Sequence, residues 1–331
     1  MNKHGGLWLF ILCCLLSAGC KDKIIPPEPN PLYAPLGAAF CSGDGTVTFF
    51  SLITNEITSS WDIGGFVSSA AFARNGTALY VANNYLGKIG VYTLPNMQRV
   101  DLLETGGIPH DLCLNQAATQ IFLINSNGNF RRYGHTDVDV DTLGVGLAPR
   151  RLALKPDHEN EVWIACRGDS SVYVVDLEHF YADDTLRFDD VPSDVCFSVS
   201  GDIAYVALQN RAGIARLSTE SYQELGSRLD SGPGPIDLAI NREGMMLVAS
   251  DSSSGIVKVW NFASGANWTQ MDLNVGRSAG RVRFANNNTF YVLLRENCQV
   301  VCVDTRGQLP EITDRIDMPS TVTELALWET P

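Results

Sequence analysis

A segment of about 42 residues occurs seven times along this chain, and this period constrains the fold more than any other feature. The clearest copies begin with proline and continue into an apolar run, as in the seven residues that start at Pro109. The first residues of the seven copies are Val67, Pro109, Pro149, Pro192, Pro235, Ala279 and Val322. A fixed period of this length is typical of an array of one supersecondary unit.

Each copy contains four short runs rich in Val, Ile, Tyr and Phe, separated by Gly, Asn, Asp and Pro. Such runs indicate strands, and four-stranded units of this length are typical of propeller blades. No helical periodicity of useful length interrupts them. We therefore predict an all-β fold, a seven-bladed β-propeller of four-stranded antiparallel blades.

The two ends of the chain predict how the ring closes. Residues 37–62 contain only three of the four runs, and the missing first run, Thr321 to Trp328, lies at the other end of the chain. The C-terminal strand is therefore expected to enter the N-terminal blade as its innermost strand, which removes the edges that an open array exposes. Residues 37–331 are predicted to form the propeller.

The N-terminus is predicted to be a processing segment. Lys3 precedes an apolar run of about ten residues, Leu7 to Leu16, which is too short to span a bilayer and is typical of a signal peptide over residues 1–19. The segment from Leu16 to Cys20 resembles the lipobox of bacterial lipoproteins, in which the cysteine is lipidated, although Ser17 replaces the usual aliphatic residue. An ordinary signal peptide and an uncleaved anchor are the alternatives. Residues 20–36 are expected to form a spacer, because five prolines favour extended chain.

Charge and sorting signals indicate the surroundings of the protein. Lys21, directly after Cys20, resembles outer-membrane sorting, so we predict a lipid-anchored protein of the bacterial cell envelope at the outer membrane, periplasmic or surface-exposed. The chain has 24 basic and 37 acidic residues, for a net charge of −13, and no basic stripe. Nucleic-acid binding needs clustered Lys and Arg and is disfavoured, and the lipid is the only membrane contact expected.

A family resemblance lies in the second and third runs. The segments Tyr80 to Asn84, Gly87 to Tyr92 and Gly106 to Pro109 resemble the YVTN-type β-propeller repeat of bacterial extracytoplasmic proteins. Val172 to Asp176 and Val300 to Asp304 resemble its third strand. The resemblance covers residues 37–328 and implies the seven-bladed fold, but it says little about function.

Aligning the innermost strands places seven residues in one column. In blade order they are Glu324, Ser69, Asp111, Arg151, Asp194, Asp237 and Arg281. Arg151 falls between Asp111 and Asp194, and Arg281 falls between Asp237 and Glu324. Two interpretations remain open: a ring of ion pairs around a narrow channel, because buried charges must be paired, or a polar socket for a small ligand.

Loops that join blades, and loops between second and third strands, are expected to share one rim, where function often resides. The candidates there are His110, Asn84, Arg167, Arg211 and Arg295. Most of them are also ordinary turn residues. A lone histidine is more often a hydrogen-bonding loop residue than a catalytic base.

A further pattern is a small residue that stands two positions after the column residue in each of several copies. Cys113 and Cys196 stand where other copies have Ala71, Ala153 and Ala239, which predicts a small buried site in which cysteine acts as a small hydrophobe. No Cys or His spacing suits a metal, so no metal or cofactor is expected.

No nucleophile elbow, zinc-protease motif or phosphate-binding loop occurs in the chain. We therefore expect a non-catalytic binding or scaffold propeller, a monomer whose partner at the channel rim is an envelope protein, a peptide or a glycan. The alternative is a lactonase, because phosphogluconolactonase-like propellers share Tyr-Val-Ala-Asn repeats on seven blades, or another propeller hydrolase or lyase. Fold alone does not decide between them.

Overall fold

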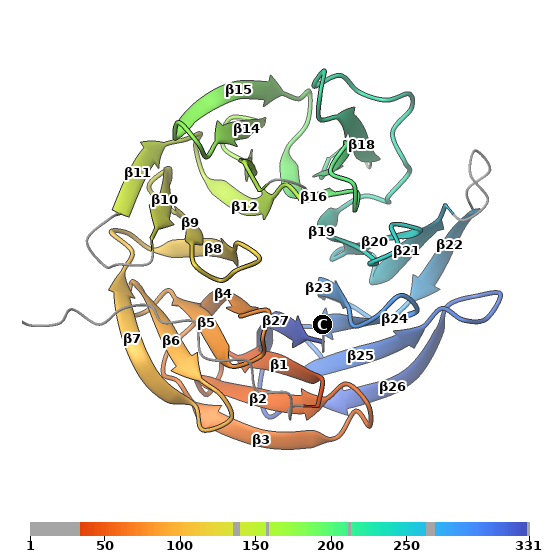
Figure 1. Ribbon diagram of the computed structural model, residues 1–331. Coiled ribbons are helices and arrows are strands. Elements are labelled where there is room, and N and C mark those ends of the chain that lie inside the picture. Colours follow the sequence, from red (N-terminus) through yellow and green to blue (C-terminus); the bar gives the residue numbers. More distant parts are fainter. Residues whose placement is uncertain (1–33, 135–139, 157–158, 211–212, 263–268, 330–331) are drawn as a thin grey trace, which may run out of the picture.

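The computed structural model describes residues 34–134, 140–156, 159–210, 213–262 and 269–329. The expected signal peptide, Cys20 and most of the spacer lie outside these residues. The described residues form seven antiparallel sheets arranged around one axis, as the ribbon in Figure 1 shows. The predicted all-β, seven-bladed β-propeller is confirmed. No described helix is long and apolar enough to cross a membrane.

Blades are numbered along the chain, and strands are counted outward from the axis. The innermost strands of blades 1 to 7 are β27 (Val322–Trp328), β4 (Val67–Phe72), β8 (Pro109–Leu114), β12 (Pro149–Leu154), β16 (Pro192–Phe197), β19 (Pro235–Ile240) and β23 (Ala279–Phe284). The second strands are β1 (Leu36–Cys41), β5 (Ala78–Asn83), β9 (Ile121–Asn125), β13 (Glu161–Cys166), β17 (Ile203–Leu208), β20 (Met246–Asp251) and β24 (Thr289–Leu294).

In most blades the third strand is mostly buried, whereas the outer strand is mostly exposed. The third strands are β2 (Thr46–Ser51), β6 (Lys88–Thr93), β10 (Asn129–Tyr133), β14 (Ser171–Asp176), β18 (Gly213–Ser218), β21 (Ile256–Asn261) and β25 (Gln299–Asp304). The outer strands are β3 (Ile57–Asp62), β7 (Gln98–Glu104), β11 (Val140–Gly144), β15 (Tyr181–Arg187), β22 (Thr269–Asn274) and β26 (Glu311–Asp317).

Blade 5 has an irregular outer edge in place of a continuous fourth strand. Leu229 and Ile214 exchange backbone hydrogen bonds of 2.9 and 3.0 Å, and a second isolated bridge joins Leu217 to Glu224. Between the two bridges Gly226 has a φ of +72°, in the left-handed region, so the extended backbone is interrupted there. The edge of this blade is therefore covered by a turn-rich segment.

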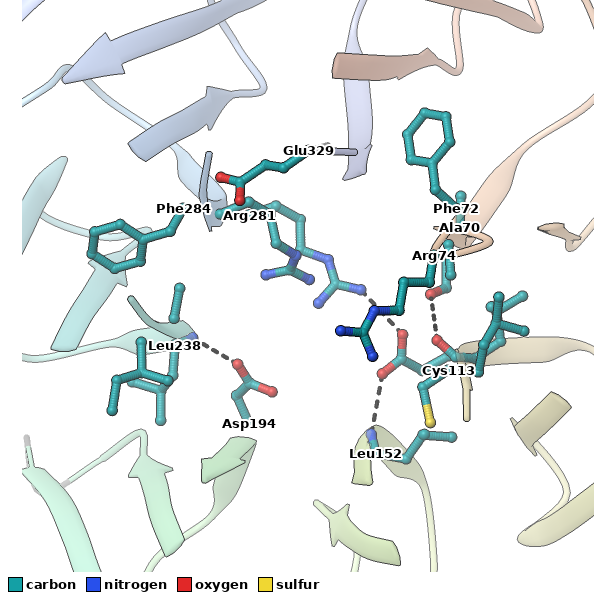
Figure 2. A pocket seen from close by; sticks show the side chains of 18 of the residues that line it. Ala70, Phe72, Arg74, Cys113, Leu152, Asp194, Leu238, Arg281, Phe284 and Glu329 are labelled. Carbon is teal, nitrogen blue, oxygen red and sulfur yellow. Dashed lines mark hydrogen bonds and ion pairs between the residues drawn. The ribbon is translucent and has the colours of Figure 1, made fainter. Parts of the chain in front are cut away.

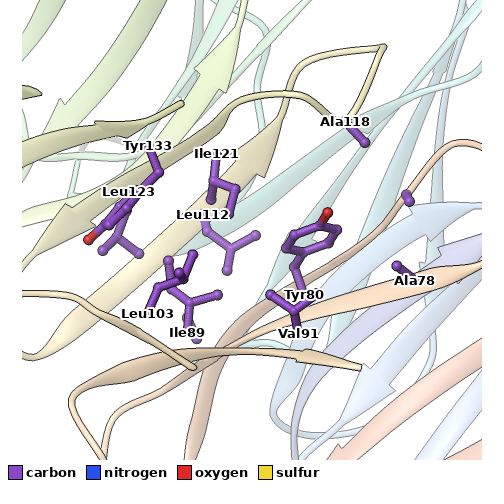
Figure 3. Close-up of a cluster of buried hydrophobic side chains, with 12 residues drawn as sticks. Ala78, Tyr80, Ile89, Val91, Leu103, Leu112, Ala118, Ile121, Leu123 and Tyr133 are labelled. Carbon is purple, nitrogen blue, oxygen red and sulfur yellow. The ribbon is translucent and has the colours of Figure 1, made fainter. Parts of the chain in front are cut away.

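The core consists of clusters that lie between neighbouring blades. In Figure 3, Tyr80 and Val91 of blade 2 pack against Leu112 and Ile121 of blade 3. Each of the other six pairs of adjacent blades has its own cluster of buried apolar residues. Because a blade buries its faces only against its neighbours, the ring must be complete for every face to be covered.

The C-terminal strand closes the ring as predicted. β27 pairs antiparallel with β1, and Ala326 lies opposite Ala38 in the register. Figure 1 shows β27 against β1 near the axis. Thr323 also donates a hydrogen bond of 3.3 Å to the Val67 carbonyl of blade 2, so this strand ties blade 1 to the next blade.

All innermost strands run in the same direction, so equivalent loops meet at the same rim. The N–H of Asn84, between second and third strands, donates to the Phe66 carbonyl between blades at 2.8 Å. Ser126 bonds in the same way to Ile108 at 2.9 Å. These loops form the blade-connection rim, as expected, and loops between first and second strands lie at the opposite rim.

Candidate functional site

The candidate site begins with a bulge that recurs near the start of every innermost strand. In β8, Pro109 and Asp111 pair with consecutive residues of β9, so His110 is extra. A register shift that leaves one extra residue on the innermost strand occurs in the six other blades as well. A bulge bends the strand and re-aims its side chains, and it turns the third residue of each strand toward the axis.

The aspartates of the column join neighbouring blades through the backbone. In three blades, an Asp carboxylate accepts the N–H that follows the column residue of the next blade. These bonds are Leu152 N–H to Asp111 at 3.1 Å, Leu238 N–H to Asp194 at 2.6 Å and Val282 N–H to Asp237 at 2.8 Å. The recurring Asp of the repeat is therefore a structural connection between blades.

Arg281 holds three carboxylates together in the centre of the ring. Its guanidinium donates to Glu324 at 2.7 Å, to Asp237 at 2.8 Å and to Asp111 at 3.1 Å. Two of these residues belong to adjacent blades and Asp111 belongs to a blade across the axis. All four side chains are buried, and a buried arginine that satisfies three acceptors compensates the loss of its hydration. The ring of ion pairs, one of the two interpretations that the sequence left open, therefore forms around Arg281.

Arg151 does not pair with both of its neighbours in the column. Its nearest carboxylates are Asp237 at 3.8 Å and Asp111 at 4.0 Å, and its buried Nε has no hydrogen-bond partner. Asp194, which follows Arg151 in blade order, forms no ion pair with a described residue. Its second oxygen accepts the N–H of Val195 at 2.9 Å. Asp194 is thus oriented by backbone donors. Among the described carboxylates of the column, it is the one without an arginine partner within 4 Å.

The protonation of the carboxylates follows from these contacts. Burial and the nearby Asp237 charge raise the pKa of Asp194 to about 7, against the opposing effect of two arginines. Burial would also raise the pKa of Asp237, but Arg283, Arg281 and Arg151 hold it below its usual value. Burial likewise opposes ionisation of Asp111, yet Arg281 and Arg151 hold its pKa low. Asp194 is therefore the group best able to exchange a proton near neutral pH.

A cavity of about 570 Å³ lies directly beyond this layer of charge. Its floor includes Asp194 and Arg281, which enter the space from different blades in Figure 2. Phe72 and Phe284, at the ends of β4 and β23, stand at its sides. The cavity opens between the first-to-second-strand loops, at the rim opposite the blade-connection rim, and we call this the cavity rim.

The mouth of the cavity is polar and its walls are apolar. Arg74 donates to the Gln116 side chain at 2.7 Å, and Arg242 pairs with Glu329 at 2.8 Å. Burial raises the pKa of Glu329, and Arg242 opposes that rise. An apolar cavity with a few convergent polar groups is the usual form of a small-ligand site. The geometry suits a ligand whose apolar body contacts the walls and whose polar group meets Asp194 and Arg281.

The structure divides the predicted site residues into three groups. Ser69, Asp111, Asp194 and Arg281 line the cavity. The ring behind them is completed by Arg151, Asp237 and Glu324. The rim candidates His110, Asn84, Arg167 and Arg295 lie at the blade-connection rim, away from the cavity, and Arg211 lies outside the described residues.

The sequence reasoning missed the residues of the cavity rim, namely Phe72, Arg74, Arg242, Phe284 and Glu329. The small residue that stands two positions after each column residue was a signal for the cavity. It predicted a buried site, but Ala71, Cys113 and Ala239 are half-buried and line the cavity. Because these side chains are short, the channel widens immediately beyond the charged layer.

Among the described residues, no group of three or more His, Cys, Asp or Glu side chains is placed to hold a metal ion. The six described cysteines are free thiols. Two of them, Cys113 and Cys196, lie on innermost strands, and burial raises the pKa of each thiol well above its usual value, which makes them poor nucleophiles.

Comparisons with known proteins support the fold and leave the family undecided. No protein-family model matches the chain, and no curated protein matches it in sequence. A functionally unknown protein from Desulfotomaculum acetoxidans is similar in structure, with a TM-score of 0.78 and 13% identity over 90% of this chain and 100% of that chain. The YVTN resemblance therefore stays a prediction.

Two other solved structures share the architecture. A Bacteroides fragilis protein provisionally named 6-phosphogluconolactonase has a TM-score of 0.74 and 13% identity, over 91% of this chain and 99% of that chain. Hydrazine synthase from Kuenenia stuttgartiensis has a TM-score of 0.68 and 11% identity, over 78% of this chain and 89% of that chain. At such identities the likeness shows the seven-bladed fold alone.

Proposed function

We propose that this protein is a lipid-anchored binding propeller of the bacterial cell envelope that holds a small ligand in its axial cavity without chemical conversion. The cavity carries the proposal, because it combines apolar walls with the ionisable side chains of Asp111, Asp194 and Arg281 at its floor. The lipobox-like segment before Cys20 and the proline-rich spacer support the anchor and its outer-membrane location. The YVTN-like segments support an extracytoplasmic setting.

The arrangement of the charges favours binding over catalysis. Arg281, Asp111, Asp237 and Glu324 are engaged with one another, so none of them is free to attack a substrate. A general base also needs a partner that orients it toward a proton on the substrate. Asp194 is instead oriented toward backbone N–H groups of β16 and β19.

A filled-cavity variant tests the proposal. Ala71→Phe on β4 places a ring in the cavity, and Ala117→Phe on the loop outside it serves as the matched control. Sugars, short peptides and small carboxylic acids are screened for their effect on the Tm of each protein. We expect some compounds to raise the Tm of the wild type and the control by several degrees, and not that of Ala71→Phe. Stabilisation that persists in Ala71→Phe would contradict the proposal.

A lactonase-like hydrolase is the second candidate function, and Asp194 favours it. The raised pKa of Asp194 lies near that of a general acid or base at neutral pH, and its carboxyl lines the cavity. The structural neighbours provisionally named 6-phosphogluconolactonase agree with this activity. Lactone hydrolysis by the wild type that disappears in Ala71→Phe would replace the binding function by this one.

A further inference from the structure

The blade-connection rim carries a band of exposed apolar side chains. Their exposed fractions range from 40% to 83%, and they come from loops of blades 2, 3 and 4. They are Phe66, Tyr85, Leu86, Ile108 and Leu147, and we call them the apolar band. Large apolar side chains that gather on one face of a soluble domain often mark an interaction site.

Backbone hydrogen bonds join the loops of the apolar band into one continuous surface. Asn84 bonds to Phe66, Thr105 to Gly87 at 3.2 Å, and Ser126 to Ile108. The series continues with Val145 to Gly128 at 2.8 Å and ends with Arg167 to Ala148 at 3.1 Å. The band is therefore held rigidly and ends beside Arg167.

An arginine cluster follows the apolar band on the same rim. The side chains of Arg150, Arg167 and Arg295 form no hydrogen bond or ion pair with the described residues, and the buried Nε of Arg295 has no partner. The neighbouring Arg151 charge, burial, and the charges of Arg281, Arg295 and Arg167 lower the pKa of Arg150 to about 10. Several unpaired guanidinium groups thus converge on the mouth of the channel.

Two carboxylates of this rim are occupied by hydrogen bonds within their own loops. Asp169 accepts hydrogen bonds from Ser171 at 2.8 Å and from Tyr173. Asp251 accepts the N–H groups of its own loop, including that of Ser253 at 2.8 Å. Neither carboxylate forms an ion pair with Arg150, Arg167 or Arg295 among the described residues, so these arginines form a basic cluster on a protein whose net charge is −13.

We propose that the blade-connection rim is a docking surface for an acidic polypeptide segment that also carries apolar side chains. Its apolar side chains would contact the apolar band, and its carboxylates would pair with the arginine cluster. The planar guanidinium matches a carboxylate with two parallel hydrogen bonds. The negative charge elsewhere on the protein repels such a segment, so electrostatics direct it to this rim. This inference is independent of the ligand proposed for the cavity.

Fluorescence anisotropy tests the docking surface with the full chain in nanodiscs of neutral lipid. The probe is a fluorescein-labelled peptide of about twelve residues in which glutamate alternates with leucine or phenylalanine, long enough to cross several rim loops. We expect saturable binding that weakens as salt is added. Arg167→Glu and Tyr85→Ser should each weaken it by about tenfold or more, because both side chains are exposed, one in the arginine cluster and the other in the apolar band.

Two matched variants away from the rim serve as controls. Leu309→Ser removes an exposed apolar side chain, 65% exposed, and Arg315→Glu reverses an exposed charge on β26. Both should bind the peptide as the wild type does. Peptides with lysine for glutamate, or serine for the apolar residues, should bind at least about tenfold more weakly.

Three results would overturn the docking surface. The first is absence of binding by the acidic peptide, and the second is equal binding by the lysine peptide or by the Arg167→Glu variant. The third is binding to vesicles containing anionic lipid that Arg167→Glu abolishes while peptide binding is unaffected, which would identify a membrane surface as the occupant. Circular dichroism of each variant verifies that it is folded.

Discussion

Asp194 shows how one position of a repeat acquires a property that its counterparts lack. Asp111 and Asp237 make the same bond to the next blade, yet their arginine neighbours keep their pKa values low. Asp194 keeps the interblade bond but has no arginine within ion-pair distance among the described residues. The difference arises because Arg151 lies near Asp111 of the preceding blade and Asp237 of blade 6, and not within ion-pair distance of Asp194 of the following blade. Which carboxylates lie near Arg151 depends on the direction of its side chain, and the order of the column residues along the chain does not predict it.

Asp194 makes the stability of the fold depend on pH. In the folded protein its carboxyl keeps a proton up to about pH 7, whereas in the unfolded chain it loses the proton near pH 4. The folded state therefore binds more protons between these values, and stability falls as pH rises. Relative to Asp194→Asn, the free energy of unfolding of the wild type should fall by as much as about 4 kcal/mol between pH 4 and 8. Denaturant unfolding at a series of pH values measures the difference.

Asp202 is the matched control for that measurement. The hydroxyls of Ser200 and Ser198 lower the pKa of Asp202, so the effect of pH on stability has the opposite sign. Relative to Asp202→Asn, the wild type should become more stable as pH rises through the acidic range. A wild-type curve parallel to that of Asp194→Asn from pH 4 to 8 would show that Asp194 is ionised as usual.

At the scale of the element, the ends of the innermost strands restrict the choice of residue as tightly as their centres do. Trp328 at the end of β27 lies over the turn between β4 and β5, and its indole N–H donates to the Arg74 carbonyl at 2.9 Å. Gly76 in that turn has a φ of +70°, and a Cβ there would lie 2.3 Å from the indole ring. The turn therefore requires glycine for its backbone and for the approach of Trp328.

Gly76→Ala should lower the free energy of unfolding by about 3 kcal/mol, because it combines a left-handed alanine with a steric clash. Gly244→Ala is the control, since Gly244 has a similar φ of +71° but a Cβ there would lie 3.4 Å from Val199. It should cost only about 1 kcal/mol. Adding Trp328→Leu should recover part of the loss at Gly76, which a double-mutant cycle in urea measures. Equal losses at the two glycines would show that Trp328 does not restrict the turn.

The strands were predictable because the repeat offers seven versions of the same pattern. The proline at the start of four innermost strands and the alternating apolar residues indicate where each strand begins and which face is buried. The bulge at His110 and its equivalents was not predictable, because it depends on pairing with the next strand. The outer edge of blade 5 was missed for a related reason: Gly226 interrupts a segment whose composition otherwise suits a strand.

At the scale of the whole molecule, closure of the ring depends on one strand. β27 supplies Val322 and Leu325 to the cluster between blades 7 and 1, Ala326 to the cluster between blades 1 and 2, and Glu324 to the central charges. The sequence predicted this closure because the first run of the N-terminal copy is missing and reappears at the C-terminus. It placed its rim candidates at the blade-connection rim, whereas the cavity opens at the opposite rim, because the position of the cavity depends on how the side chains beyond Ala71 and Ala239 fill the channel.

Deleting Thr321 to Pro331 should abolish cooperative unfolding of the entire propeller. Two interblade clusters would lose buried area and β1 would become an exposed edge, so the loss spreads from both sides of blade 1. Thermal melts followed by circular dichroism, together with limited proteolysis, measure the effect. A protease-resistant fragment covering blades 2 to 7 would show instead that only blade 1 depends on the strand.

Deleting only Glu329 to Pro331 is the matched control, because β27 ends at Trp328 and stays intact. This shorter deletion removes the Glu329–Arg242 ion pair, in which Arg242 is largely exposed, and such pairs contribute little to stability. Its melting curve should therefore resemble that of the full chain.

The position of β1 determines how the protein bears a mechanical load. Leu36 at the start of β1 lies opposite Trp328, so the chain from the proposed lipid anchor enters at the cavity rim, on the face away from the apolar band. A pull between a partner held on that band and the anchored N-terminus acts along β1, which is flanked by β27 and β2. The hydrogen bonds on both of its sides are then sheared together and do not open one after another. A ring closed in this way therefore resists unfolding when a bound partner pulls against the anchored N-terminus.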